Sequence, residues 1–205
     1  MRIGVFGGSF DPVHMGHLIA AECCREQAGL DRVLFVPAAI PPHKQGRQLA
    51  AARHRLEMLS LATGGHAAFA IASDELDRGG VSYTVDTLAR LAARHVGDQL
   101  FLLLGPDAAF GLPTWREPGR ILELAEIVVM ERESLDDIGS VSCRAALEPL
   151  LGPERLGRLI DARVRLPAIG IRASDLRSAV AAGRSIRYRT PRAVEQYIAN
   201  HGLYR

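Results

Sequence analysis

The sequence predicts a doubly wound α/β fold, in which parallel strands alternate with crossover helices. Short apolar runs alternate with helical patterns along most of the chain, and this order is typical of a parallel sheet. The run Leu100–Leu104 is apolar at every position, as expected of a strand that is covered on both faces. The first strand ends at glycines just before a helix, a pattern that favours a phosphate-binding turn.

The expected elements follow from the spacing of apolar residues. Continuous apolar runs predict strands at Arg2–Phe6, Arg32–Val36, Ala67–Ala72, Leu100–Leu104, Ile127–Met130 and Val164–Leu166. Helical spacing predicts helices at His14–Gln27, Ala50–Leu61, Thr84–Arg94 and Ser174–Ala182, and a last one from Thr190 to Asn200. Thr190 is expected to cap that last helix, with Pro191 in its first position. The sheet is expected within residues 1–170, and residues 171–205 are expected to form a small C-terminal helical cap.

Composition excludes several classes of protein. The chain has 205 residues and a formal net charge of +2, and no basic run carries interleaved aromatics, so nucleic acid is not an expected partner. No apolar stretch reaches the length of a membrane span or a signal peptide, which predicts no membrane contact and a cytoplasmic location. The cysteines Cys23, Cys24 and Cys143 have neither metal-ligand spacing nor the even count of a disulfide framework.

The first motif follows the first predicted strand. Its glycines fit neither the dinucleotide spacing G-x-G-x-x-G nor the P-loop, which needs Gly-Lys-Ser/Thr. Instead His14 and His17 are three residues apart, so both imidazoles are expected on one face of a helix. Imidazole can donate hydrogen bonds to phosphate oxygens. A metal pair or two incidental histidines remain alternatives, although no third metal ligand is evident nearby.

The segment Gly7-Gly8-Ser9-Phe10-Asp11-Pro12, with His14-Met15-Gly16-His17, resembles the signature of the HxGH nucleotidyltransferase superfamily. Together with the motifs below, it resembles the bacterial nicotinate mononucleotide adenylyltransferase family. The resemblance implies a Rossmann-like sheet and a turn that binds ATP. The ATP-binding residues that it implies here are Gly7, Gly8, Ser9, Phe10 and His17.

Further motifs concern the substrates. Pro41-Pro42-His43-Lys44 resembles a family segment that places a lysine near the substrate phosphates, and Lys44 is the single lysine beside 24 arginines. Ser82-Tyr83-Thr84-Val85-Asp86-Thr87-Leu88 would be a capped helix start on physical grounds alone. In the resembled family this segment holds the nicotinate carboxylate, which implies substrate binding by Ser82, Tyr83 and Thr84. The family stacks the pyridine ring on a tryptophan at the place of Trp115, with ordinary packing as the alternative.

Two later motifs depart in part from the family. Gly105-Pro106-Asp107 resembles Gly-Ala-Asp, with Gly105 and Asp107 implied in ATP binding, but Pro106 removes one backbone donor. Ile171-Arg172-Ala173-Ser174-Asp175-Leu176-Arg177 keeps Ser174 and Arg177, which would meet ATP phosphates at a helix start. Arg172 and Ala173 replace two serines there.

The resemblance implies that ATP and nicotinate mononucleotide give deamido-NAD and pyrophosphate. Mg²⁺ would travel with the ATP, since both substrates are polyanions, and no residue is expected to bind a metal directly. The residues expected to carry the reaction are His14, His17, Lys44 and Arg177. Nicotinamide mononucleotide or phosphopantetheine as acceptor, or a nucleotide sensor without turnover, remain alternatives. A homo-oligomer also remains open.

Overall fold

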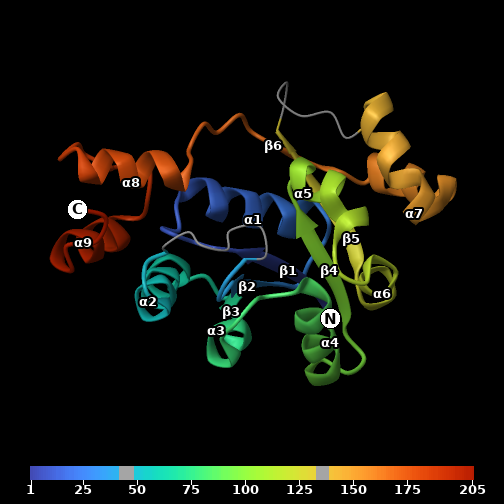
Figure 1. Ribbon diagram of the computed structural model, residues 1–205, viewed down its shortest axis with the longest axis horizontal. Coiled ribbons are helices and arrows are strands. Elements are labelled where there is room, and N and C mark those ends of the chain that lie inside the picture. Colours follow the sequence, from blue (N-terminus) through green and yellow to red (C-terminus); the bar gives the residue numbers. More distant parts are fainter. Residues whose placement is uncertain (42–48, 133–138) are drawn as a thin grey trace. The chain divides into compact units, whose positions relative to one another are not determined.

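The computed structural model describes residues 1–41, 49–132 and 139–205. Within these residues six strands form one parallel sheet in the order β3-β2-β1-β4-β5-β6 (Figure 1). The strands are β1 Arg2–Gly8, β2 Arg32–Pro37, β3 Phe69–Ile71, β4 Gln99–Leu104, β5 Glu126–Arg132 and β6 Val164–Leu166. The predicted doubly wound α/β class is therefore confirmed, and each predicted strand overlaps an observed one.

The strand order reverses at β1, which is the arrangement that doubly wound folds use to form a binding turn. β1 and β4 run parallel, with Arg2 opposite Gln99 and Val5 opposite Leu102. Their inner residues are buried because a parallel sheet is covered on both faces. β1 carries glycines at its carboxyl end, so the chain leaves the sheet there with room to turn.

The chain divides into two compact units. The first comprises Met1–Phe6, Glu22–Val33 and Tyr83–Ala168. Its helices are α4 Thr84–Arg94, α5 Pro106–Gly111, the 3-10 helix η2 Leu112–Thr114, α6 Pro118–Leu124 and α7 Val141–Asp161. α4 packs against α6, and α7 packs against β5.

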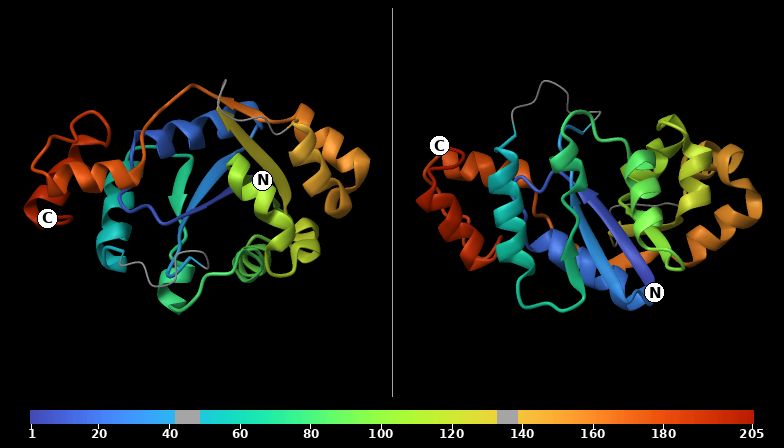
Figure 2. Two further views of the ribbon diagram at one scale, coloured as in Figure 1. Left: turned by 45° about the horizontal axis from the view of Figure 1, so that its top comes forward. Right: turned by 90° about the horizontal axis from the view of Figure 1, so that it is seen from below.

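The second unit comprises Gly7–Ala21, Leu34–Ser82 and Ile169–Arg205. It holds α2 Ala52–Thr63, α3 Asp74–Arg78, α8 Ala173–Ala181 and α9 Arg192–Asn200, while α1 Met15–Gln27 begins here. α2 and α9 lie side by side, teal and red in Figure 2. The expected division into residues 1–170 and 171–205 stays a prediction.

Several helices were not expected from the sequence. α3, α5 and α6 are only 5, 6 and 7 residues long, too short to show a helical apolar period. α7 has 21 residues but contains Pro149 and Pro153, and it is broken at Gly152, whose φ of 72° and ψ of 161° are not helical. Those residues hide the helix in the sequence.

The expected cap of the last helix is wrong. α9 begins at Arg192 with Pro191 as its N-cap, and the hydroxyl of Thr190 does not cap it. Thr190 is buried, and its Oγ1 donates instead to the carbonyl oxygen of Val13 at 2.9 Å. Beside it, the Met15 N–H donates to the Arg189 carbonyl. The residues before α9 are therefore fastened to the start of α1.

Among the residues described, no helix combines the length and the apolar character that crossing a lipid bilayer requires.

Candidate active site

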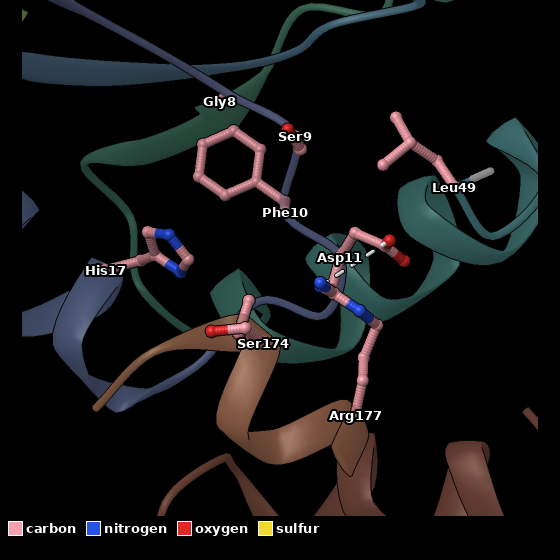
Figure 3. Close-up of a pocket in the computed structure, with 9 residues that line it drawn as sticks. Gly8, Ser9, Phe10, Asp11, His17, Leu49, Ser174 and Arg177 are labelled. Carbon is pink, nitrogen blue, oxygen red and sulfur yellow. Dashed lines mark hydrogen bonds and ion pairs between the residues drawn. The ribbon is translucent and has the colours of Figure 1, made fainter. Parts of the chain in front are cut away.

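A pocket of about 320 Å³ lies within the second unit (Figure 3). It is formed by the turn after β1, the first turn of α1, Leu49 just before α2, and the N-terminal part of α8. The lining residues are Gly8, Ser9, Phe10, Asp11, His17, Leu49, Ala173, Ser174 and Arg177. Six of these were expected in the site from the sequence: Gly8, Ser9, Phe10, His17, Ser174 and Arg177.

The glycine turn is shaped by a buried aromatic ring. Phe10 is only 1 % exposed and has a positive φ of 46°, which is uncommon outside glycine. Its ring lies against Gly8, where an added Cβ would come within 2.9 Å of Phe10 Cζ. The same ring meets the edge of His17 at a centroid distance of 5.1 Å. Phe10 therefore supports both Gly8 and His17, while Gly7 has open space where a Cβ would stand.

The two histidines of the motif are stacked. Their ring centroids are 3.7 Å apart, so the expectation that they share one face is confirmed. The His14 N–H donates to His17 Nδ1 at 3.3 Å. A nitrogen that accepts carries no proton, so the neutral His17 ring has its proton on Nε2. An added Cβ on Gly16 would lie 3.1 Å from His14 Nδ1, and glycine at this position therefore leaves room for the stack.

His14 is held as a neutral imidazole. It is 6 % exposed, and burial lowers its pKa from 6.5 to about 4. Its Nδ1 has no hydrogen-bond partner among the described residues. The cause of the lowered pKa is burial, because a buried ring loses the solvation that favours its charged form.

The start of α1 offers fewer backbone donors than the sequence suggests. The N–H of His14 donates to His17, that of Met15 to Arg189, and that of His17 to the His14 carbonyl. Anion binding at a helix start needs N–H groups without internal acceptors. The pocket lining also offers polar side chains, those of His17, Ser174 and Arg177.

Arg177 lies at one wall of the pocket with Asp11 (Figure 3). Its Nη1 donates to the main-chain carbonyl oxygen of Asp11 at 2.5 Å and is 3.8 Å from Asp11 Oδ2. Ser174 lies one turn earlier on α8 and donates to Asp175 Oδ1 at 3.2 Å. α8 thus places a hydroxyl and a guanidinium on the same side of the pocket.

Arg55 was not singled out in the sequence. Its guanidinium is buried and donates to the carbonyls of Ser9, Ala38 and Ala50. These bonds tie the end of the glycine turn to the segments after β2 and before α2. Burial lowers its pKa, while the nearby Asp11 charge opposes that shift. The signal in the sequence was faint: Arg55 is spaced with Met58 and Leu59 on the buried face of α2.

The segment expected to hold the nicotinate carboxylate is divided between the two units. Ser82 is buried, and its Oγ accepts the Ala39 N–H at 3.0 Å within the second unit. Tyr83 and Thr84 belong to the first unit, where Tyr83 is the N-cap of α4 and makes no side-chain cap. The expected side-chain cap is therefore not formed, and the Ser82 hydroxyl accepts from Ala39 instead.

The remaining expected site residues lie in the first unit. Gly105 is the N-cap of α5, and Pro106 is its first residue, a position whose N–H has no partner within the helix. Asp107 is exposed in the same turn, and Trp115 is half-buried after η2. Pro106 therefore does not disturb the helix. Lys44 lies outside the described residues.

Over residues 1–41, 49–132 and 139–205, no group of three or more His, Cys, Asp or Glu side chains could hold a metal ion.

Comparison with known proteins gives three findings. The cytidylyltransferase-like family model matches residues 5–179. A protein of Thermomicrobium roseum called a probable nicotinate-nucleotide adenylyltransferase is 47 % identical, covering 100 % of this chain and 92 % of its own length. A protein of Thermus thermophilus with the same description is 43 % identical over 100 % of both chains.

Solved structures agree on the fold. The nicotinic acid mononucleotide adenylyltransferase of Plasmodium falciparum, complexed with NaAD, superposes with a TM-score of 0.72. It covers 99 % of this chain and 97 % of its own, at 16 % identity. A putative nicotinate-nucleotide adenylyltransferase from Vibrio parahaemolyticus gives 0.66 at 17 % identity, covering 100 % and 95 %.

Proposed function

We propose, from the premise that this chain belongs to the cytidylyltransferase-like family, that it transfers the adenylyl group of ATP to nicotinate mononucleotide. The products are deamido-NAD and pyrophosphate, so the chain is a nicotinate-nucleotide adenylyltransferase of NAD biosynthesis. The observation that carries the proposal is the pocket at the glycine turn, where His17, Ser174 and Arg177 converge. That set supplies hydrogen-bond donors for a polyanion.

The chemistry needs no covalent intermediate on the protein. A phosphate oxygen of nicotinate mononucleotide attacks the α-phosphorus of ATP, and the bond from that phosphorus to the bridging oxygen of the β-phosphate breaks. Pyrophosphate leaves with the electron pair of the broken bond. Transfers of this kind depend on positioning the two phosphates and neutralising their charge, and the pocket presents hydrogen-bond donors for both tasks.

His17 would act as a neutral donor through Nε2, since its Nδ1 already accepts the His14 N–H. The pair is stacked, so His14 fixes the plane of the His17 ring and contributes a second imidazole that burial keeps neutral at physiological pH. A donor that needs no reorganisation stabilises developing charge effectively.

Arg177 and Ser174 would contact the triphosphate from the side of α8, and Lys44 would add a further cation. We assign ATP binding also to Gly7, Gly8, Ser9 and Phe10 of the glycine turn, and to Gly105 and Asp107. On the acceptor side we assign Ser82, Tyr83 and Thr84 to the nicotinate carboxylate and Trp115 to the pyridine ring. Helix starts and hydroxyls favour a carboxylate, whereas a neutral amide would need acceptors.

Mg²⁺ would enter as the complex with ATP. The ligands of such an ion are chiefly phosphate oxygens and water. When bound with ATP, Mg²⁺ supplies further neutralisation of the phosphate charge.

The test is pyrophosphate release with ATP and each acceptor in turn. The proposal expects release with nicotinate mononucleotide, and slower release with nicotinamide mononucleotide. Faster release with phosphopantetheine or with nicotinamide mononucleotide would reassign the acceptor. Binding of ATP with no release from any acceptor would identify a sensor and overturn the proposed transfer.

A further inference from the structure

Asp11 is an unusual residue for a phosphate-binding pocket. It is only 2 % exposed and carries a carboxylate at the wall where a polyanion would bind. Its Oδ1 accepts the Tyr204 hydroxyl at 2.6 Å and the Ala50 N–H at 3.3 Å. Its Oδ2 is buried and has no hydrogen-bond partner among the described residues. A buried acceptor without a donor is costly, so this oxygen attracts any donor within reach.

Arg177 is a cationic donor near this oxygen. Its Nη1 is 3.8 Å from Asp11 Oδ2, which is beyond hydrogen-bond distance, and it donates to the main-chain carbonyl of Asp11 instead. A guanidinium and a carboxylate would ordinarily form a bidentate pair with two parallel hydrogen bonds. Such a pair would turn the Arg177 donors toward Asp11 and away from a bound phosphate.

Tyr204 blocks that pair. Its hydroxyl and the Ala50 N–H together take both acceptor sites of Oδ1, one of the two oxygens that a bidentate guanidinium needs. Burial raises the pKa of Tyr204, and so does its hydrogen bond to Asp11, so the hydroxyl keeps its proton and remains a donor. Arg55 lies behind, buried and bound to the carbonyls of Ser9 and Ala38, and its charge offsets that of Asp11.

We propose that Tyr204 is a positioning residue for ATP binding. By holding Asp11 Oδ1, its hydroxyl keeps the Arg177 guanidinium on the Asp11 main-chain carbonyl and available to the phosphates of ATP. This inference rests on the proposed function only in taking ATP as the ligand of the pocket. Asp11 is then both the anchor of Arg177, through its carbonyl, and a competitor for it, through its carboxylate.

The experiment measures the Kd of ATP by calorimetry without an acceptor, and the KM of each substrate, in wild-type protein and in Tyr204→Phe. The substitution keeps the ring and removes only the hydroxyl. We expect about tenfold weaker ATP binding, the size of one hydrogen bond to a charged group, with a similar rise in the KM of ATP and little change for nicotinate mononucleotide. An unchanged Kd for ATP would overturn the proposal.

Two double variants separate an effect of Tyr204 on the position of Arg177 from an effect on the stability of the fold. In an Arg177→Ala background, Tyr204→Phe should weaken ATP by less than about twofold more, because the residue that it positions is gone. The double variant Asp11→Asn with Tyr204→Phe should bind ATP nearly as tightly as wild type, because an amide competes poorly with the ATP phosphates for the Arg177 guanidinium. Equal weakening with and without Arg177 would show that Tyr204 acts on the fold and not through Arg177.

Tyr197→Phe is the matched control. Tyr197 lies in the same unit, and its hydroxyl is bonded to His54 Nδ1 at 2.9 Å, away from the pocket lining. Its loss should leave the Kd of ATP unchanged. If Tyr204→Phe does not fold, Asp11→Asn alone decides: we expect tighter ATP binding, and weaker binding would contradict the competition.

The measurement of ATP binding does not depend on adenylyl transfer, because it is made without an acceptor. Pyrophosphate release by the wild-type protein tests the proposed function separately, so either idea can fail while the other stands.

Discussion

At the scale of single residues, the site depends on close approaches that only glycine permits. Gly16 separates the two histidines, and a methyl group there would lie 3.1 Å from His14 Nδ1 and 3.2 Å from His14 Cε1. That distance is shorter than van der Waals contact between a carbon and a ring, so the His14 ring would have to move. Its movement would release His17 from the stack that orients it.

Gly16→Ala should therefore lower kcat by about 10- to 100-fold, the effect of misplacing a donor by a fraction of an ångström to one ångström. The measurement is steady-state pyrophosphate release at saturating substrates. Gly157→Ala, in the interior of α7 with open space around the added methyl group, is the control and should leave kcat unaffected. Unaltered turnover in Gly16→Ala would remove the stack from the mechanism.

The buried His14 predicts a pH dependence of stability. Its pKa is about 4 in the folded protein and 6.5 when unfolded, so the unfolded chain binds a proton that the folded chain does not. Stability is complete above pH 6.5 and falls as the pH drops toward 4, by about 3 kcal/mol. Urea unfolding of wild type and His14→Gln across this range measures it. The variant should lose less stability on acidification, and an equal loss in both proteins would contradict the assignment.

The site could be predicted in part from the sequence. The residues of the motif, together with Ser174 and Arg177, were indicated by local patterns and by resemblance, and the pocket gathers six of them. Asp11 and Tyr204 are bonded across 193 residues of sequence, and neither residue type nor spacing announces such a pair. Arg55 was hidden for a different reason: among many arginines, a buried one looks like the rest.

At the scale of elements, the segments before α1 and α9 fasten each other. Thr190 Oγ1 donates to the Val13 carbonyl, and Met15 donates to the Arg189 carbonyl. The bond from Thr190 is buried, so water cannot replace it. These two bonds hold the histidine turn against the chain that leads into the last helix, and they link the shape of the pocket to α9.

Thr190→Val should lower the free energy of unfolding by about 1 to 3 kcal/mol, because the Val13 carbonyl would be left buried without a donor. Valine keeps the shape of threonine, so packing is preserved. Thr114→Val removes an exposed hydroxyl that donates to the Gly111 carbonyl, and it should cost less than about 0.5 kcal/mol. Chemical denaturation of both variants compares them, and equal destabilisation would show that burial of the bond is unimportant.

Elements with a strong period were predictable, and those without one were not. The buried strands are continuous apolar runs, and α4 begins and ends where its pattern does, at Thr84 and Arg94. α7 was not predicted because Pro149, Gly152 and Pro153 interrupt its helical pattern, although tertiary packing still buries its apolar face. The cap at Thr190 was mistaken because a buried acceptor outside the helix competes with the helix N–H groups for the same hydroxyl.

At the scale of the whole molecule, the protein is a parallel sheet with a pocket beside the glycine turn that follows β1. Because Mg²⁺ is proposed to enter bound to ATP, activity should require Mg²⁺ in proportion to ATP and not to protein.

Chelation with excess EDTA should abolish turnover, and the Mg²⁺ concentration that restores half of it should rise as ATP is raised, because ATP is the ligand of the ion. The check is a series of Mg²⁺ titrations at several ATP concentrations. A half-saturating Mg²⁺ concentration that stays fixed while ATP changes would instead point to a site on the protein.

The central claim is adenylyl transfer to nicotinate mononucleotide, and the most direct test follows the α-phosphate. ATP labelled at the α-phosphorus is mixed with an excess of the protein and nicotinate mononucleotide, and the products of a single turnover are separated. The label should enter deamido-NAD while unlabelled pyrophosphate is released. Label that stays in ATP, or that appears in AMP without any dinucleotide, would contradict it.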